Sequence, residues 1–229
     1  MEQLSYYGYG IQVALKGAHI TLMITAASLV IGLLLGFIIS NGKMSRRKPL
    51  RVITTIYIEM LRGTPLLVQV LILVYGIPNL ITTITGGSVM FNWNNMLLAG
   101  IIACGINSSA YMAEVIRSGM QAVDKGQTEA ARSLGMSHAQ TMRLVVIPQA
   151  FKIVIPALGN EFITLIKETA VLSAISITDI TRASMLWASA KFLPWQAYLG
   201  TAVVYMMLTI PLSKIMGVLE RKMSQDVSS

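Results

Sequence analysis

Long apolar runs without charged residues are the feature that most constrains how this chain can fold. The first run, residues 18–40, contains no Asp, Glu, Lys or Arg. An α-helix of about 20 residues crosses the roughly 30 Å hydrocarbon core of a bilayer, so this run predicts a membrane helix. Four more apolar runs follow, at residues 52–77, 95–115, 153–173 and 196–219. The pattern predicts an all-α integral membrane protein with about five transmembrane helices.

The second run is longer than one crossing needs, and it contains Glu59 and Arg62. Its first turns are expected at the membrane surface. The two charges lie three residues apart on one helix face, where they are expected to neutralise each other. Pro65 is expected to kink this helix and Pro78 to end it.

Composition agrees with a membrane protein. Only 12% of the 229 residues are charged, about half of the roughly 25% found in soluble domains. The net charge of +8 could also suit nucleic acid, but the basic residues lie between the apolar runs, so no nucleic-acid partner is expected. One cysteine and two histidines exclude an internal disulfide framework and leave no metal site.

The distribution of basic residues predicts the orientation, because cytoplasmic loops carry an excess of Lys and Arg. Thirteen basic residues lie on one side of the predicted membrane, between runs one and two, between runs three and four, and at the C-terminal end. Three lie on the other side: Lys16, Arg182 and Lys191. The N-terminus is therefore expected outside and the C-terminus in the cytoplasm, which agrees with an odd number of spans.

The cytoplasmic segment, residues 116–152, is too polar to span a membrane. A helix-forming run at 127–134 is followed by Gly135, the residue type that commonly ends a helix in a left-handed conformation. Ser137 and Gln140 have the spacing of a capping box. They are expected to open a second short helix, residues 138–147, which Pro148 ends.

This segment resembles the EAA signature of permease subunits of bacterial ABC importers. In that family E-A-A is followed by three residues, a glycine, nine residues and I-x-L-P. Here Glu129-Ala130-Ala131, Gly135 and Val145-Val146-Ile147-Pro148 keep the spacing, with two conservative changes. Residues 59–67 and 160–169 also resemble the polar amino-acid branch of the family. The resemblance extends over nearly the whole chain and implies one transmembrane domain, residues 1–229.

The resemblance implies that the short helix before Gly135 is a coupling helix, docked on a separate cytoplasmic ATPase subunit. The residues assigned to this contact are Glu129, Ala130, Ala131, Arg132, Leu134 and Gly135. The alternative is an ordinary amphipathic helix on the membrane surface. The resemblance further implies two ATPase subunits, a second permease subunit (identical or homologous), and an extracytoplasmic amino-acid-binding protein, assembled at the bacterial cytoplasmic membrane.

No Gly-Lys-Ser or Gly-Lys-Thr occurs in the chain, so it lacks the phosphate-binding loop of many ATPases. No Ser-His-Asp set or carboxylate pair indicates catalysis either. We therefore expect a transport subunit rather than an enzyme. It should bind no cofactor, because ATP and Mg²⁺ would be held by the partner ATPase.

The fourth run contains several polar residues that fall on one side of a helix. At about 100° per residue they occupy a stripe roughly 120° wide, while the opposite side is mostly apolar and lipid-like. This polar stripe consists of Asn160, Glu161, Thr164, Lys167 and Glu168. Charges inside a membrane normally face a cavity or a partner, so the stripe predicts a substrate pathway. The alternative is a structural ion pair of Lys167 with Glu161 or Glu168.

Position adds to the argument for Glu161. It lies about 12 Å from the cytoplasmic end of its run, near the membrane midplane, where it could meet a substrate amino group.

The first run offers two weaker features. Thr21 and Thr25 share one face and are candidates for the pathway, with hydrogen bonding back to their own helix as the alternative. Gly32 and Gly36 form a GxxxG pattern, which predicts close helix packing.

The function expected from these features is ATP-driven import of polar or basic amino acids such as arginine, histidine, lysine or glutamine. The same machinery could carry cystine or another polar solute. An ATP-independent secondary transporter or channel is the alternative of another class, but such transporters often contain internal repeats, and the sequence has no convincing duplication.

Overall fold

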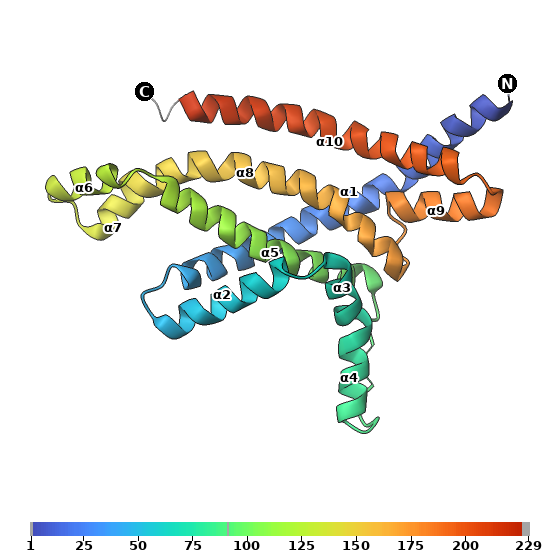
Figure 1. Ribbon diagram of the computed structural model, residues 1–229, viewed down its shortest axis with the longest axis horizontal. Coiled ribbons are helices and arrows are strands. Elements are labelled where there is room, and N and C mark those ends of the chain that lie inside the picture. The colour runs from blue at the N-terminus through green and yellow to red at the C-terminus, as the bar shows by residue number, and fades with distance from the viewer. Residues whose placement is uncertain (1, 91, 226–229) are drawn as a thin grey trace.

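The computed structural model describes residues 2–90 and 92–225, which are helical over most of their length and contain no strand. Five helical segments are long and apolar enough to cross a membrane: Ser5–Lys43, Leu66–Ile84, Met96–Ala122, His138–Ile175 and Pro194–Met223. The two chain ends lie at opposite ends of the molecule, as an odd number of spans requires (Figure 1). The predicted all-α architecture with five spans is confirmed.

Ten α-helices are described, joined in three places by short segments of other helical type. They are α1 (Glu2–Lys43), α2 (Lys48–Arg62), α3 (Leu66–Leu71), α4 (Ile77–Ile84), α5 (Met96–Ala122), α6 (Lys125–Ser133), α7 (His138–Thr141), α8 (Ile147–Glu168), α9 (Ile180–Lys191) and α10 (Pro194–Gln225). A π-helical segment precedes α4 (Ile72–Gly76) and another precedes α8 (Met142–Val146), and a 3₁₀ segment follows α8 (Thr169–Ile175). Helices α1, α5, α8 and α10 form the main bundle, with α1 packed on α5 and α10, and α8 packed on α5 and α10.

Close contact between α1 and α5 is made possible by glycine. A Cβ atom on Gly32 would lie 2.6 Å from Ser108 Oγ, and one on Gly36 would lie 2.6 Å from Met112 Cβ. Ser28 adds a hydrogen bond across the same contact by donating to the Ile101 carbonyl at 3.0 Å. The packing predicted from the GxxxG pattern is confirmed.

The second predicted span, residues 52–77, is wrong at both ends. Helix α2 stops at Arg62, because the backbone at Pro65 is extended (φ −61°, ψ 139°) and a new helix begins only at Leu66. Pro78 does not end that helix but lies in the first turn of α4, where a missing N–H costs little. The π segment before it closes with Ile77 N–H donating to the Ile72 carbonyl, a wider turn through which the helix continues.

Pro148 behaves in the same way, so the predicted end of the second loop helix at residue 147 is also wrong. Ile147 N–H donates to the Met142 carbonyl at the end of the π segment, and α8 follows directly. Helical structure is therefore continuous from α7 through α8.

The turn between α6 and α7 forms as predicted. Gly135 has φ +83°, and Met136 N–H donates to the Ala131 carbonyl at 3.2 Å, which is the bond that closes a Schellman motif. Ser137 and Gln140 make both hydrogen bonds of the predicted capping box. Helix α6 starts two residues earlier than expected, at Lys125, because Asp124 serves as its N-cap.

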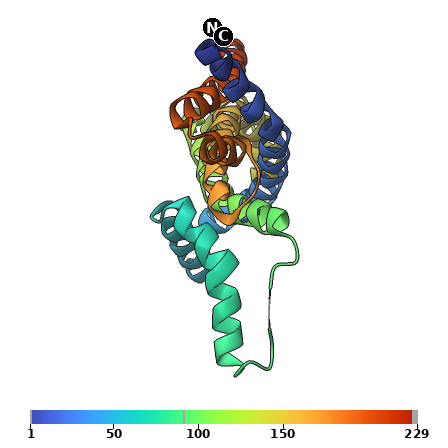
Figure 2. The ribbon, with the colours of Figure 1, turned by 90° about the vertical axis from the view of Figure 1, so that its right-hand side faces the viewer.

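One segment leaves the bundle. Helix α3, the first π segment and α4 together form a side arm, Leu66–Ile84, which projects away from the other helices (Figures 1 and 2). Ile72, Tyr75, Leu80 and Ile84 are all more than half exposed along it. In a membrane protein such an apolar surface needs lipid or a partner protein around it.

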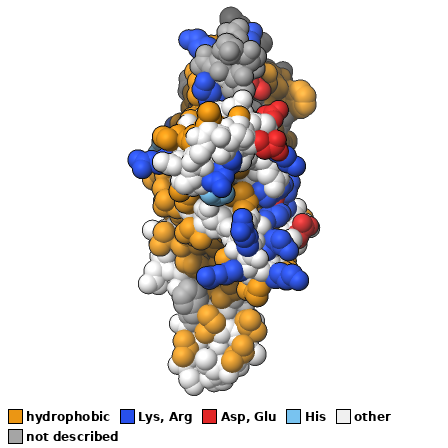
Figure 3. Space-filling view, turned by 90° about the vertical axis from the view of Figure 1, so that its left-hand side faces the viewer, with side chains coloured by type: hydrophobic (Ala, Val, Ile, Leu, Met, Phe, Trp, Pro, Cys, Tyr) orange, Lys and Arg blue, Asp and Glu red, His pale blue; other side chains and the backbone are white. Residues whose placement is uncertain are grey.

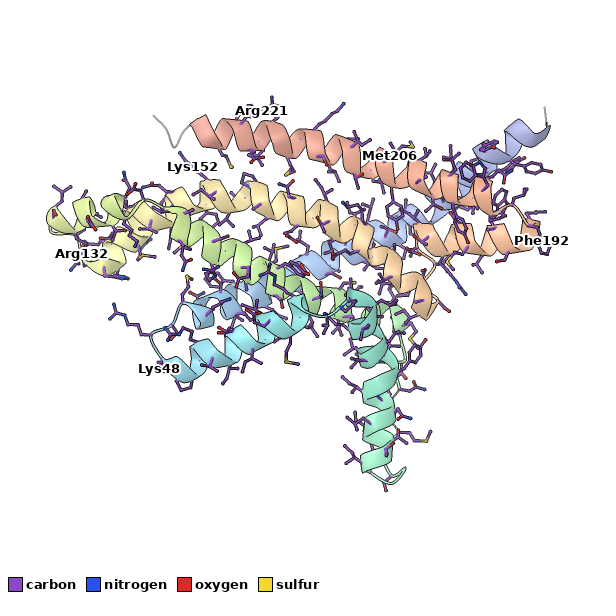
Figure 4. The ribbon with its side chains drawn as sticks, in the orientation of Figure 1. Lys48, Arg132, Lys152, Phe192, Met206 and Arg221 are labelled. Carbon is purple, nitrogen blue, oxygen red and sulfur yellow. The ribbon has the colours of Figure 1, made fainter. Side chains whose placement is uncertain are left out.

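Basic side chains gather at the end of the molecule that carries α6 and α7 (Figure 3). Lys48 and Arg132 both lie there, and Phe192 lies at the opposite end (Figure 4). Glu114 of α5 is held at this basic end by Lys43 of α1 and by Arg117, the latter at 2.7 Å. The charge asymmetry read from the sequence is thus an asymmetry of the folded molecule, with the basic end on the side predicted to be cytoplasmic.

The α1–α5 contact gives a direct test of the packing. Gly36→Ala should lower the melting temperature of the detergent-purified protein, because overpacking costs about 1–3 kcal/mol. Gly8→Ala is the matched control on the same helix, since a Cβ there has no neighbour within 4 Å. It should leave the melting temperature unchanged or raise it. Equal stability of the two variants would contradict the close packing.

Candidate functional site

The candidate coupling residues lie on a protruding unit formed by α6, α7 and the turn between them, here termed the α6–α7 projection (Figure 1). Five of the six are exposed: Glu129, Ala130, Arg132, Leu134 and Gly135. Leu134 is 84% exposed beside the glycine turn. The projection thus presents charged and apolar groups together at one end of the molecule.

Ala131 is the exception among these candidates. It is only 5% exposed, and it is the buried residue of a helix that packs on α7 and the second π segment. Thr141 and Val146 of those elements are buried as well. Ala131 therefore holds the projection together from inside, while Ala130 offers the small exposed surface.

The polar stripe points away from the core of this chain. Asn160 and Lys167 are exposed, and Glu161, Thr164 and Glu168 are half-buried. On the other side of α8, Ile163, Leu165 and Ile166 are buried. The interpretation of that side as lipid-facing is wrong, because these residues pack inside the bundle and the polar side is the one that faces outward.

The proposed structural ion pair is not formed. Over the described ranges 2–90 and 92–225, the two ion pairs within 4.0 Å both involve Glu114. Lys167 makes no such contact with Glu161 or Glu168. The charges of the stripe therefore remain directed toward the space outside this chain.

Thr21 and Thr25 do not lie on the stripe. Both are fully buried. Thr25 Oγ1 donates to the Thr21 carbonyl at 2.8 Å, and Thr21 Oγ1 accepts from the Ile180 backbone N–H at 3.3 Å. The pathway role predicted for them is wrong, since the Thr25 hydroxyl bonds back to its own helix and the Thr21 hydroxyl binds the start of α9.

Arg62 lies against α5, a placement that sequence reasoning missed. Its guanidinium carbon is 5.4 Å from the ring centroid of Tyr111 on α5, within the range of a cation–π interaction. The expected pair with Glu59 is absent from the ion pairs of the described residues. Helical spacing suggested that pair, and nothing in the sequence indicated that the helix ends at Arg62 and turns it toward α5.

Gln69, also missed, fixes the break between α2 and α3. Its Nε2 donates to the Leu61 carbonyl at 2.8 Å and to the Thr64 carbonyl at 2.9 Å. Its Oε1 accepts from Asn107 Nδ2 of α5 at 3.0 Å. The amide therefore ties the break, and Arg62 just before it, to α5.

Neither region provides a metal site. No group of three or more His, Cys, Asp or Glu side chains that could hold a metal ion occurs in the part of the chain that the structure describes. The described side chains offer charged and polar groups along α8, and charged and apolar groups together at the projection.

Known proteins resemble this chain over nearly its whole length. The arginine transport system permease protein ArtQ of Bacillus subtilis (strain 168) is 36% identical over 212 residues, which cover 93% of this chain and 93% of ArtQ. The L-cystine transport system permease protein TcyB of the same organism is 34% identical over 213 residues, which cover 93% of this chain and 87% of TcyB.

Solved structures share the fold. One chain in the crystal structure of an amino acid ABC transporter with histidines is 43% identical and matches with a TM-score of 0.85, over 96% of this chain and 97% of that chain. A chain of the inward-facing MetNI methionine ABC transporter matches with a TM-score of 0.71 at 18% identity. The second likeness shows the fold alone.

The family model described as binding-protein-dependent transport system inner membrane component matches residues 17–225. The five apolar helices agree with a multi-pass protein of the cytoplasmic membrane. This chain therefore belongs to the family of inner membrane components of binding-protein-dependent transport systems.

Proposed function

We propose that this chain is the membrane-spanning subunit of an ATP-driven importer of polar or basic amino acids. The relatives carry arginine and cystine by name, and the structurally similar transporter was crystallised with histidines. Arginine, histidine, lysine and glutamine are the leading substrates, with cystine or another polar solute as the alternative.

The observation that carries this proposal is the outward-facing polar stripe of α8. Charged groups near the middle of a membrane cost about 2.5–3.5 kcal/mol each on insertion scales, so a stripe facing lipid would be unfavourable. A water-filled passage beside α8 removes that cost and gives the charges a function. Asn160, Glu161 and Thr164 are the residues we assign to substrate contact, with Lys167 and Glu168 further along the same face.

One chain with an outward-facing stripe cannot enclose a passage, so we assign a second permease subunit, identical or homologous, to its other side. The side arm supports pairing, because its apolar surface is left uncovered by this chain. An extracytoplasmic amino-acid-binding protein would deliver the substrate to the outer end of the passage.

The energy for transport is assigned to separate subunits. Two ATPase subunits, which would hold ATP and Mg²⁺, would dock on the α6–α7 projections of the paired permeases. In this assignment Glu129, Ala130, Arg132, Leu134 and Gly135 form the contact, and Ala131 supports it from inside. This chain itself would bind no nucleotide and catalyse no reaction.

An ATP-independent secondary transporter or channel is the competing function. The exposed projection favours the importer, since a channel needs no rigid docking unit at its basic end. Purification of the chain together with the proteins bound to it decides between the importer and the ATP-independent transporter or channel. A stable ATPase partner is expected, and its absence would favour the transporter or channel.

The turn at Gly135 yields a test of coupling. Valine in the left-handed conformation of residue 135 costs about 1–3 kcal/mol of strain. This strain would lie at the proposed docking surface. Gly135→Val should leave the protein in the membrane but reduce ATP-driven uptake of L-arginine or L-histidine, and Glu129→Lys should do the same by reversing a charge. Uptake by right-side-out vesicles loaded with ATP, beside membrane yield, measures both effects.

The control for this test is Gly86→Val. Gly86 also has a positive φ, +58°, with nothing within 4 Å of an added Cβ, but it lies at the tip of the side arm. It should carry similar backbone strain with normal coupling. Normal ATP-driven uptake by Gly135→Val and Glu129→Lys would overturn the assignment of α6 as a coupling helix.

The stripe yields a second test. Glu161→Gln keeps the size of the side chain and removes one charge. Because no ion pair holds Glu161, membrane yield and melting temperature should stay at the wild-type level while substrate-stimulated ATPase activity and uptake change. Glu220→Gln, an exposed acid on α10, is the control and should change neither.

Two results would contradict the assignment of Glu161. A collapse in yield that Lys167→Met restores would indicate a structural ion pair. Unchanged uptake together with unchanged stability would mean that Glu161 does not face the passage.

A further inference from the structure

Arg62 of α2 and Tyr111 of α5 meet, and α5 packs on α8, the helix that carries the polar stripe. Arg62 ends α2 with its guanidinium carbon 5.4 Å from the Tyr111 ring centroid. No nitrogen–oxygen distance of 4.0 Å or less joins Arg62 to Glu161, among the ion pairs found for residues 2–90 and 92–225. Arg62 and Glu161 are therefore not joined in a direct ion pair.

The packing of α5 against α8 supports this placement. A Cβ on Gly119 would lie 2.2 Å from Val154 Cγ2 of α8, and one on Gly100 would lie 3.2 Å from Leu172 Cδ1 in the 3₁₀ segment that follows α8. The two helices are therefore antiparallel. Tyr111 lies eight residues before Gly119 and Glu161 seven residues after Val154, so the two lie at about the same level. The cation held over Tyr111 thus sits at the height of the carboxylate.

Arg62 is held at this position from several sides. Gly63 caps α2 by donating its N–H to the Glu59 carbonyl at 2.8 Å. The Gln69 amide binds the backbone on both sides of Arg62, at Leu61 and Thr64, and is itself tied to α5. Arg62 is an exposed residue, and its guanidinium offers a planar set of N–H donors to a ligand.

We propose that Arg62 binds the α-carboxylate of the transported amino acid while Glu161 receives its α-ammonium group. A fixed cation and a fixed anion at about the same level of the helix bundle, and not in contact, match the two charges of a zwitterion. Guanidinium binds carboxylate through two parallel hydrogen bonds, which gives orientation as well as affinity. Tyr111 keeps the guanidinium plane in place. The inference rests on the proposed function and deepens it, because it names the group common to all amino acids that the passage would recognise.

The competing explanation is that Arg62 only offsets the charge of Glu161 inside the membrane. In that case any cation at residue 62 would serve, and the ligand's carboxylate would be irrelevant. The two explanations differ in one measurable property, which is discrimination between an amino acid and its α-carboxamide. The amide keeps the side chain and the ammonium group but loses the negative charge.

The test uses the purified complex of this chain with its ATPase subunits and without binding protein, so that only the permease can discriminate. The melting temperature is followed against concentration of L-arginine, L-histidine and L-glutamine, each beside its α-carboxamide. Wild type should be stabilised by at least one of these acids and not by the matching amide. Arg62→Gln should weaken the apparent affinity for that acid about tenfold or more, because a charge-assisted pair is lost, and should abolish the discrimination.

Two further variants make the result specific. Arg62→Lys keeps the charge without the planar pair of donors, so it should fall between wild type and Arg62→Gln. Arg51→Gln removes an exposed arginine at the other end of α2 and should behave as wild type. If Arg62→Gln fails to assemble, Arg62→Lys and the wild-type comparison of acid with amide still distinguish carboxylate binding from charge compensation.

Equal stabilisation of wild type by acid and amide, or retained discrimination in Arg62→Gln, would overturn the role of Arg62. If discrimination persists in Arg62→Gln while Glu161→Gln loses binding, the proposed passage stands and only the carboxylate assignment fails. If no amino acid stabilises wild type, the proposed amino-acid passage fails as well.

Discussion

The structure depends on one constraint, which is that a charged face inside a membrane must not meet hydrocarbon. In helix α8, Ile163 and Ile166 pack inside the bundle, whereas Glu161 and Lys167 lie on the outward side. The apolar core of the bundle is complete without the stripe. This chain alone does not surround the stripe with polar groups. A second subunit is therefore expected to complete its environment.

A continuous helix links the polar stripe to the α6–α7 projection. Since Pro148 does not end the helix, α7, the π segment and α8 form one helical rod from His138 to Glu168. At 1.5 Å per residue, Thr164 lies about 39 Å along this rod from His138. The α6–α7 projection is packed on the start of the rod. A displacement of the projection would therefore be transmitted along α8 to the residues assigned to the passage.

Rigid packing of α1 against α5 supports such transmission. Gly32 and Gly36 bring α1 against α5 at a distance that leaves no room for a methyl group. The Glu114 carboxylate joins α1 and α5 again at the basic end. Helix α5, which connects to the projection through α6, is thereby fixed to α1 and can serve as the frame against which α8 moves.

Local sequence signals predicted local structure well. Hydropathy predicted the number of spans and located four of the five, the spacing of Gly32 and Gly36 predicted a contact, and Gly135 with the Ser137 capping box predicted the turn of the projection. These features depend on a few adjacent residues, or on one face of one helix. Backbone hydrogen bonding and residue size are sufficient to determine them.

Features that depend on distant residues were not predictable in this way. Pro78 and Pro148 look like helix ends, but a π turn before each lets the helix continue. The position of Thr21 on its helix suggests a pathway residue, but its hydroxyl accepts a hydrogen bond from the Ile180 N–H at the start of α9.

The same limit applies to side-chain partners. Helical spacing pairs Arg62 with Glu59, whereas the structure places it over Tyr111, 49 positions away in the sequence. Such contacts depend on how distant helices pack, which local sequence patterns do not predict.

Water access along α8 tests the central claim most directly. Cys104 is buried and is the one cysteine of the chain, so a Cys104→Ala background allows single cysteines to be placed at positions 160, 164, 163 and 166. In native membranes, a charged, water-soluble thiol reagent should modify cysteines at 160 and 164 but not those at 163 and 166. Modification of 163 and 166 instead, or of none of the four while a lipid-soluble reagent labels 160 and 164, would contradict a passage along the polar stripe.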